Sequence, residues 1–443
     1  MNGAHIGVTP GAEMFMPMTG WRRLTSSRPY TFLTCTAAAG ALLITGCGAL
    51  PGASGDSREP VTVVTWAPDG SNGPDAENMA GMTAMARAYA RWVNNNGGLD
   101  GHKLRVVTCN EDDTSNGAGD CARRAVAEKA VAVVGSYSPE GHSFMGPLEA
   151  AGIPYIGGYG ASTEEFTSYN SYPVNGGQSA LLAGNAKQLA RSCERVSLVR
   201  PDTLGGDSQA WLFSTGLKEE KRSAPTDVRA AEAATSYDQA AEQALEGAGR
   251  SDGCVTTVLG DRTETFFDSF RRLEPSDGPV RISSVLGSVG QPLINSTGGR
   301  NSPFEGAYVT GWYPESGDAR WDKMRAVIRK HAFGDNRIDP DDTGVQTTWI
   351  AYTALKEIVT AIDAPDITGS KITTALNRGA EVDTGGLTPV LRWRYEDMLG
   401  SSAYPRIVNR KVTFQVVRKG RLVAERKGFV DVTNTLSEAS AKG

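Results

Sequence analysis

Short apolar runs alternate with amphipathic stretches along most of this chain, and the alternation predicts strands and helices in turn. Val61–Trp66 is rich in β-branched residues and ends in a polar loop, which is typical of a buried strand. From Met79 to Val93 the large apolar residues recur at helical spacing. Asn94–Gly98 then offers residues that tolerate left-handed backbone, and Lys103–Thr108 is a second apolar run. The opening unit is therefore predicted to be a strand, a helix and a strand.

The same alternation continues in two series, which are separated by a polar, Gly-rich stretch near residues 172–177. Both series contain short apolar runs that predict further strands: 131–134, 153–156, 196–199, 255–259 and 280–286. A weaker run at 228–233 predicts a strand at a sheet edge. Strands that alternate with helices favour parallel sheets, and ligand groups gather at the carboxyl ends of such strands.

Three later segments complete the pattern. Thr343–Ile362 carries apolar residues at alternating spacings of three and four, which predicts a strongly amphipathic helix. The runs 412–417 and 422–423 flank a charged turn and predict a hairpin. Residues 433–443 are predicted to be a disordered tail.

The stretch from Pro68 to Leu104 resembles the opening of the branched-chain amino-acid-binding proteins, the type I solute-binding proteins of ABC importers. A polar loop, a long helix and the turn Asn94-Asn-Asn-Gly-Gly-Leu-Asp-Gly-His-Lys-Leu104 follow one another in the family's order. The resemblance extends over residues 61 to 430, where Phe304–Tyr313 is similar to a crossing between lobes. It implies an α/β fold of two Rossmann-like lobes, periplasmic binding protein-like I, joined by a multi-segment hinge with the ligand cleft between them.

The implied fold assigns each part of the chain to a lobe. Residues 61–174 and 312–400 are expected to form the first lobe, and Thr343–Ile362 is expected to be its return helix. Residues 175–311 and 401–432 are expected to form the second lobe.

The first 46 residues have the pattern of an export signal. Arg22, Arg23 and Arg28 precede an uncharged run that is shorter than the about 20 residues of a membrane-spanning helix. The run ends at Ile44-Thr-Gly-Cys47, which resembles the lipobox of bacterial lipoproteins, where the cysteine is acylated and becomes the N-terminus. A plain signal peptide with an incidental cysteine is the alternative. Residues 47–60 are small and polar and predict a flexible tether, so the expected location is the outer face of the cell membrane.

The charge of the chain argues against nucleic acid as a partner. The formal net charge is -5, and removal of the first 46 residues leaves 42 basic against 49 acidic residues. A surplus of acidic residues repels polyanions.

Four cysteines remain beyond the acylation site, and they are expected to lie outside the reducing cytosol: Cys109, Cys121, Cys193 and Cys254. Four cysteines allow three pairings. Cys193 and Cys254 each stand just before an apolar run, and we read these runs as neighbouring parallel strands entered from the same edge. We therefore expect a Cys193–Cys254 bridge and a local Cys109–Cys121 bridge. A zinc site is the alternative, but the sequence has no Cys-x-x-Cys motif and no paired histidines near these positions.

The resemblance implies that loops of the first lobe offer hydroxyls, backbone N–H groups and helix N-termini to an anionic ligand group. The candidate residues in these loops are Asn78, Tyr137, Ser138, Tyr159 and Ser162. For the serines the alternative role is a helix cap, and for the tyrosines it is packing at the sheet edge.

The second lobe departs from the family pattern. Amino-acid-binding members supply a tyrosine before a glycine and an acidic residue that pairs with the ligand's ammonium group. Here Leu204 stands before Gly205, and the loop Gly287–Gly290 has no carboxylate. Because a buried, unpaired ammonium group is costly, we expect a ligand other than a standard branched-chain amino acid. Leu204, Arg262 and Ser288 are the candidate contacts from this lobe. Asp202 and Asp261 are further charged candidates at strand ends, and solvated surface is the alternative for these aspartates and for the arginine.

The sequence gives little support for catalysis, a cofactor or a metal. Gly141–Gly146 comes near to a nucleophile elbow, but its second glycine is one residue late and its serine falls within a predicted helix. The expected function is therefore a lipid-anchored solute-binding protein of an ABC importer, which captures a small polar ligand by closing two lobes and presents it to a permease. A ligand-sensing lipoprotein of a signalling system is the first alternative, and an extracytoplasmic enzyme is the second.

Overall fold

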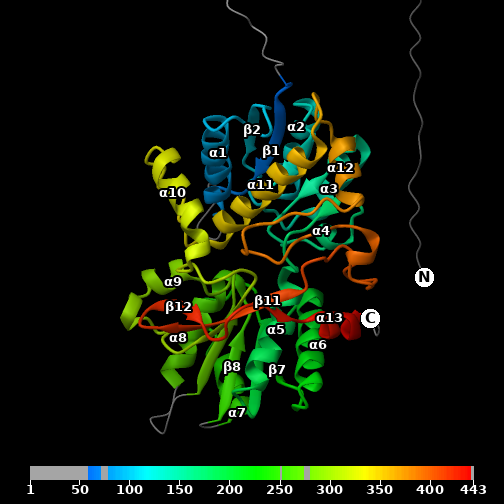
Figure 1. Cartoon of the computed structure of the whole chain (residues 1–443). Coiled ribbons are helices and arrows are strands. Elements are labelled where there is room, and N and C mark those ends of the chain that lie inside the picture. The colour runs from blue at the N-terminus through cyan, green and yellow to red at the C-terminus, as the bar shows by residue number, and fades with distance from the viewer. Residues whose placement is uncertain (1–57, 71–77, 250–251, 274–279, 441–443) are drawn as a thin grey trace, which may run out of the picture. The chain divides into compact units, whose positions relative to one another are not determined.

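The computed structural model describes residues 58–70, 78–249, 252–273 and 280–440. These residues form two β-sheets with helices packed on the faces of each sheet (Figure 1). The α/β fold of two lobes is therefore confirmed. The predicted export signal, the acylation site Cys47 and residues 47–57 of the predicted tether lie outside the described residues.

The first sheet consists of five parallel strands in the order β2-β1-β3-β4-β5. Their bounds are β1 (Val61–Trp66), β2 (Leu104–Cys109), β3 (Ala132–Val134), β4 (Tyr155–Ile156) and β5 (Ser171–Tyr172). Neighbouring residues of β1 face opposite sides: Val63 belongs to the core cluster that contains residues of α1 and α11, and Val64 to the cluster with α2 and α3. Burial on both faces explains why the strand reads as one continuous apolar run.

Seven helices accompany the first sheet in the described part of the chain. They are α1 (Ala80–Asn94), α2 (Ser115–Ala127), α3 (Gly141–Ala151), α4 (Glu164–Thr167), α10 (Asp322–His331), α11 (Thr343–Ile362) and α12 (Gly369–Asn377). The predicted return helix is α11, and it packs on α1 although more than 200 residues separate them in the chain. Aromatic rings join the two helices, because Tyr89 lies 5.2 Å from Trp349 and 5.3 Å from Tyr352 between ring centroids.

The second sheet has the strand order β12-β11-β10-β9-β8-β6-β7, and β13 pairs with β11. Strands β6 to β10 are parallel, whereas β11 runs antiparallel to β10, β12 and β13. The bounds are β6 (Arg195–Pro201), β7 (Thr226–Ala230), β8 (Gly253–Thr257), β9 (Arg281–Val285), β10 (Tyr308–Gly311), β11 (Lys411–Arg418), β12 (Arg421–Ala424) and β13 (Val430–Asp431). The predicted edge strand is β7, and the predicted hairpin is β11 with β12.

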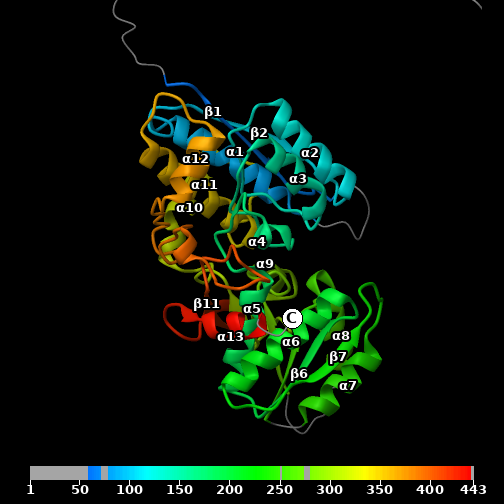
Figure 2. The same cartoon turned by 90° about the vertical axis from the view of Figure 1, so that its right-hand side faces the viewer.

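Helices cover both faces of the second sheet (Figure 2). They are α5 (Gly177–Ala190), α6 (Leu204–Glu219), α7 (Asp238–Ala248), α8 (Thr263–Leu273) and the short α9 (Gln291–Ser296). Ser197 of β6 donates a hydrogen bond to a carbonyl of α7, and Thr256 of β8 donates one to Asn185 of α5. Because Ser197 pairs with Val255, the residue beside Thr256, the two helices lie on opposite faces of the sheet.

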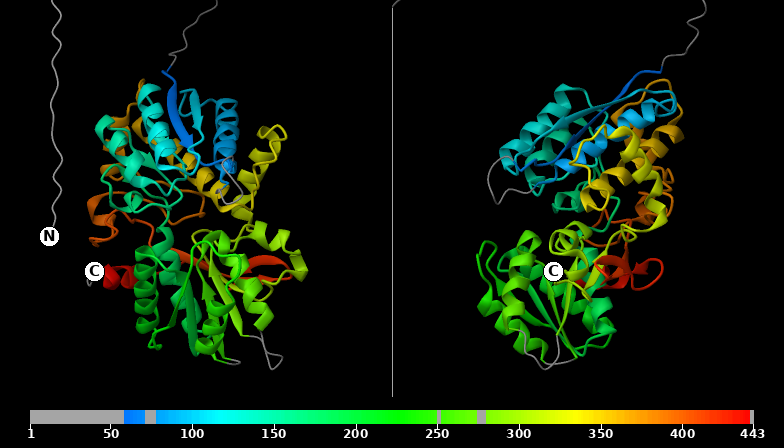
Figure 3. Two further views of the ribbon diagram at one scale, coloured as in Figure 1. Left: turned by 180° about the vertical axis from the view of Figure 1, so that it is seen from behind. Right: turned by 90° about the vertical axis from the view of Figure 1, so that its left-hand side faces the viewer.

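The chain passes between the sheets three times (Figure 3). It leaves the first sheet after β5 and enters α5, and it returns after β10 towards α10 and α11. The third passage leads from the short 3₁₀ turn Tyr395–Asp397 to β11.

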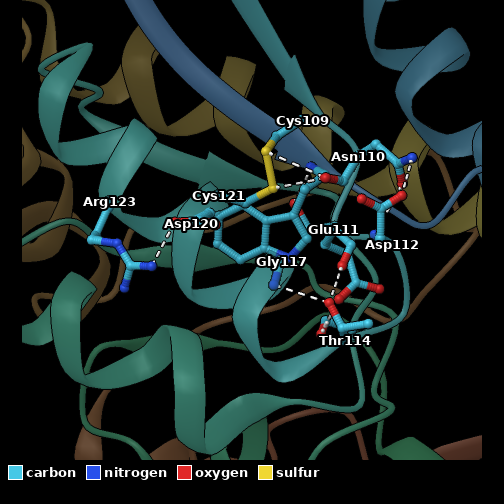
Figure 4. The surroundings of a disulfide bond; sticks show 12 residues. Cys109, Asn110, Glu111, Asp112, Thr114, Gly117, Asp120, Cys121 and Arg123 are labelled. Carbon is cyan, nitrogen blue, oxygen red and sulfur yellow. Dashed lines mark hydrogen bonds and ion pairs between the residues drawn. A yellow bond between two sulfur atoms is a disulfide. The ribbon is translucent and has the colours of Figure 1, made fainter.

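Both expected disulfides are present. Cys109 at the end of β2 is joined to Cys121 in α2, with 5.7 Å between their Cα atoms (Figure 4). Cys193 is joined to Cys254 in β8, with 5.8 Å between their Cα atoms. Val196 of β6 pairs with Cys254 of β8, so Cys193 and Cys254 lie close together where these two neighbouring strands begin.

The structure corrects the bounds of two predicted segments at the ends of the folded region. The predicted disordered tail contains helix α13 (Thr433–Ser440), which packs on α5 and α6 and fully buries Leu436. A buried leucine supplies the apolar contact that orders this helix. Residues 58–60 of the predicted tether are also fixed, because Arg58 contacts Asp100 at 2.6 Å and Asp363 at 2.9 Å.

No helix within the described residues has both the length and the apolar character to cross a membrane.

Candidate ligand-binding site

Aromatic rings gather where strands of the two sheets end. Tyr137 follows β3 and Tyr159 follows β4, and their ring centroids lie 5.2 Å apart. Trp312, directly after β10 of the second sheet, packs edge-on against Tyr159 at 5.4 Å. Both tyrosines are half-buried and Trp312 is buried, while Met79 and Met82 of the neighbouring loop and helix lie in contact with the tyrosines. The structure thus brings two of the predicted ligand residues into one aromatic wall.

The loops of the two sheets meet at Tyr159. A Cβ atom placed on Gly287, in the loop after β9, would lie 3.2 Å from the Tyr159 hydroxyl oxygen. Gly287 has a φ of +97°, a conformation that favours glycine. Ser288, another predicted ligand residue, follows it in the same turn and donates its N–H to the Val285 carbonyl at 3.1 Å. The carboxyl ends of β4 and β9 therefore face each other.

Ser138 has a structural role in this structure. Its side chain is fully buried, donates a hydrogen bond to the Glu111 carboxylate at 2.9 Å and accepts one from the Glu140 N–H at 3.1 Å. The second bond lies in the turn that precedes α3, which begins directly after Glu140. Burial raises the pKa of Glu111 to about 7. Glu111 was not predicted, because nothing in the local sequence distinguishes it from Asp112 and Asp113 beside it, which are half-buried.

A second buried carboxylate organises the loop after β4. Glu165 is 1% exposed and accepts hydrogen bonds from the backbone N–H groups of Gly160, Ala161 and Ser162 at 3.0, 2.9 and 3.1 Å. Burial raises the pKa of Glu165 to about 7, although the three N–H donors act in the opposite direction. Ser162 is itself buried. The sequence contains a pattern that could have predicted this role of Glu165. Ser162-x-x-Glu165 matches the capping box, in which the glutamate side chain accepts a hydrogen bond from the backbone N–H of the serine.

The remaining predicted residues lie at other strand or helix ends. Asn78 is exposed, and its Oδ1 accepts a hydrogen bond from the Ala80 N–H at the start of α1. Leu204 is the first residue of α6 and is 87% exposed. Arg262 ends the 3₁₀ turn after β8 and is half-buried. The structure places Leu204 and Arg262 after β6 and β8, two other strands of the second sheet.

Hydrogen bonds connect the aromatic wall to the crossing segments. Asn175 Nδ2 in the first crossing donates to the Tyr159 carbonyl at 3.2 Å and to the Tyr313 hydroxyl at 3.1 Å. Tyr313 in the second crossing also lies 3.1 Å from Thr347 Oγ1 of α11, between the two hydroxyl oxygens. Thr413 of β11, after the third crossing, donates to the Tyr313 carbonyl at 2.7 Å. The sequence shows only a pause in the strand and helix pattern at 172–177, so the role of Asn175 was not predicted.

Surface cavities are found away from these strand ends. One of about 320 Å³ lies beside Pro314 and Thr413, and another of about 530 Å³ lies between the end of α11 and α12. Neither is lined by a predicted ligand residue. Within the described residues, no group of three or more histidine, cysteine, aspartate or glutamate side chains is placed to hold a metal ion.

Residues 66–404 match the sequence model of a family described as periplasmic binding proteins. The chain belongs to the periplasmic binding protein family. The recognition made from the opening residues is thereby confirmed, and membership indicates an exported protein. A sequence search of curated proteins gives no match.

Solved structures with the same fold cover most of this periplasmic binding protein. A branched-chain amino-acid ABC transporter protein from Thermus thermophilus with bound valine is 16% identical, covering 86% of this chain and 100% of its own, with a TM-score of 0.65. A solute-binding protein from R. palustris in complex with 4-hydroxybenzoate is 15% identical, covering 84% and 97%, with a TM-score of 0.67. A fatty acid ABC transporter substrate-binding protein from Thermomonospora curvata is 13% identical, covering 87% and 94%, with a TM-score of 0.64. At these identities the likeness establishes the fold.

Proposed function

We propose that this periplasmic binding protein is the lipid-anchored receptor of an ABC importer. It captures a small polar molecule between its lobes and delivers the closed form to a membrane permease. The observation that supports this most directly is the meeting of the loops after β4 and β9 at Tyr159 and Gly287, because a ligand held there touches both sheets. A ligand that binds both lobes stabilises the closed state through its higher affinity for that state.

The hinge of this mechanism consists of the three crossing segments. Their hydrogen bonds run through Asn175 and Tyr313 and include the carbonyl of Tyr159. A ligand that moves the Tyr159 loop therefore acts on groups that also hold the hinge. The similar structures, which are described with valine, with 4-hydroxybenzoate and as part of a fatty acid transporter, support a role in binding small molecules.

The ligand is found first by a thermal-shift screen of metabolites on the purified chain, because saturation at about 100 times the dissociation constant adds roughly 2.7 kcal/mol of stability. Leucine, isoleucine and valine are expected to give no shift. Tyr159→Ala is expected to weaken binding of the hit. Tyr169→Ala removes a tyrosine that is 65% exposed between α4 and β5, and it is the matched control that keeps full affinity.

Transport is tested in cells. Deletion of the gene is expected to abolish uptake of the radiolabelled hit, and the wild-type gene is expected to restore it. Unchanged uptake together with a lost transcriptional response to the ligand would instead favour a sensor. Mass spectrometry of the membrane-extracted protein is expected to show a diacylglyceryl group on Cys47, and an unmodified N-terminus at another residue would exclude the anchor.

A further inference from the structure

The backbone N–H groups of the loop after β4, which an anionic ligand group would use, are already bonded within the chain. Three consecutive N–H groups, those of Gly160, Ala161 and Ser162, converge on the carboxylate of Glu165. An ordinary capping box uses one backbone N–H in this way, whereas here one side chain takes three. The loop after β4 therefore holds a carboxylate of its own.

The sequence around Glu165 leaves space for its carboxylate. A Cβ atom on Gly158 would collide with Glu165 Oε2 and with the Tyr155 ring, so only glycine fits at this position. Gly160 has a φ of +95°, which turns the backbone so that its N–H points to the same carboxylate. The arrangement is thus built from glycines on both sides of Tyr159.

In the loop after β3 the polar groups are also hydrogen-bonded within the chain. The hydroxyl of Ser138 donates to Glu111, and the N–H of Tyr137 donates to the Trp66 carbonyl at 3.0 Å. Glu111 and Ser138 are both fully buried. Two internal carboxylates, Glu111 and Glu165, therefore bond the hydroxyl and the N–H groups that an anionic ligand group would need.

The loop of the second lobe that meets Tyr159 offers no charged partner for a cationic group. The loop Gly287–Gly290, which meets Tyr159, carries no carboxylate, and the exposed residue at the start of α6 is Leu204. The rings of Tyr137 and Tyr159 and the side chain of Ser288 are half-buried where the loops meet. Such rings bind flat apolar faces.

We infer that the ligand is an uncharged molecule with a ring that packs on Tyr137 and Tyr159, and that Glu165 fills the position of an anionic ligand group. This inference rests on the proposed function, because it names the class of molecule that the receptor captures. A ligand carboxylate in the same loop would stand beside Glu165 without N–H donors, and burying it unpaired would cost more than its other contacts return.

The first experiment removes the carboxylate of Glu165 from the loop after β4. In Glu165→Ala the three N–H groups lose their acceptor, so the variant is expected to melt at a lower temperature than the wild type. Sodium acetate is expected to restore part of that loss in a saturable way, whereas sodium chloride of equal ionic strength is not. Glu164→Ala is the matched control, since its side chain is not an acceptor for these N–H groups, and acetate is expected to leave it unchanged. Equal responses of the two variants to acetate would overturn the assignment of Glu165.

The second experiment uses the wild-type chain and does not depend on the folding of a variant. Amide resonances of Gly160, Ala161 and Ser162 are followed by NMR while benzoate, leucine, benzamide and benzyl alcohol are added in separate titrations. The uncharged ring compounds are expected to bind at least about tenfold more tightly than benzoate or leucine, because the N–H groups that a ligand carboxylate would need are bonded to Glu165. Tighter binding of benzoate or leucine, or no binding of either uncharged compound, would overturn the inferred ligand class. Uptake of a charged ligand that depends on the gene would overturn this inference and leave the proposed function intact.

Discussion

The two disulfides differ in the length of chain that they close, and this difference predicts how much each stabilises the protein. The Cys193–Cys254 bridge spans 61 residues and the Cys109–Cys121 bridge spans 12. A bridge restricts the unfolded chain, and the loss of loop entropy grows with the logarithm of the loop length. On that relation the longer bridge contributes about 4 kcal/mol at 25 °C and the shorter about 3 kcal/mol.

The perturbation is a pair of double variants, Cys193→Ala/Cys254→Ala and Cys109→Ala/Cys121→Ala. Alanine avoids a buried hydroxyl at positions such as Cys254, whose side chain is fully buried. Free energies of unfolding are measured by guanidinium denaturation and compared with those of the wild type. The reduced wild type serves as the control, because it loses both bridges and keeps all the sulfur atoms.

The variant without the longer bridge is expected to be less stable than the variant without the shorter bridge by about 1.4 kcal/mol. The reduced wild type is expected to be less stable than either variant. An equal or larger loss for Cys109→Ala/Cys121→Ala would refute the argument from loop entropy. In that case the packing of the bridge against β2 and α2 would stabilise the protein more than the restriction of the unfolded chain does.

Three further perturbations test the buried polar groups and the last helix. Burial raises the pKa of Glu165 to about 7, above the ordinary carboxyl value that applies in the unfolded chain, so its contribution to stability is complete below pH 4.5 and is lost as the pH rises through 7. The free energy of unfolding of Glu165→Gln and of the wild type is measured by denaturation from pH 5 to pH 8. Over this range the variant is expected to become about 3 kcal/mol more stable relative to the wild type. A difference between the two that does not change with pH would contradict the raised pKa. The side chain of Arg200 is 1% exposed and lies 2.7 Å from both Asp207 and Asp227. Arg200→Met is therefore expected to lower the free energy of unfolding, measured in urea, by about 2 kcal/mol. This loss is smaller than that for breaking a fully buried ion pair, because water can still hydrate both carboxylates. Leu436→Ala is expected to cost about 3 kcal/mol by the same measurement, and a cost near zero would indicate that α13 does not pack on α6.

Local periodicity predicted much of the fold. The helix predicted at 343–362 is found at Thr343–Ile362, and the first strand is found at Val61–Trp66. Both segments are long or uniformly apolar, so their pattern is visible in the sequence alone. The short elements α4, α9 and β5 were not predicted, because two to six residues carry too little periodicity to distinguish a helix or strand from a loop.

The candidate site could be predicted only in part. The sequence pointed to Tyr137 and Tyr159 because each follows a predicted strand, and the structure brings their rings into contact. It did not separate them from Ser138 and Ser162, which are buried within the first lobe. Whether a serine after a strand faces a ligand or caps a helix depends on which neighbour lies within hydrogen-bond distance, and that neighbour is Glu111 in one loop and Glu165 in the other.

The sequence by itself determined the alternation of strands and helices and the family, because both are carried by patterns along the chain. The pairing of the cysteines followed only once neighbouring strands were assigned to the same sheet. The tertiary structure alone decided that Thr433–Ser440 is a helix, since the apolar surface that buries Leu436 belongs to helices more than 200 residues earlier. It also decided which polar groups of the strand-end loops are already paired. Burial and hydrogen bonding depend on every group that surrounds an atom, and only the folded chain brings those groups together.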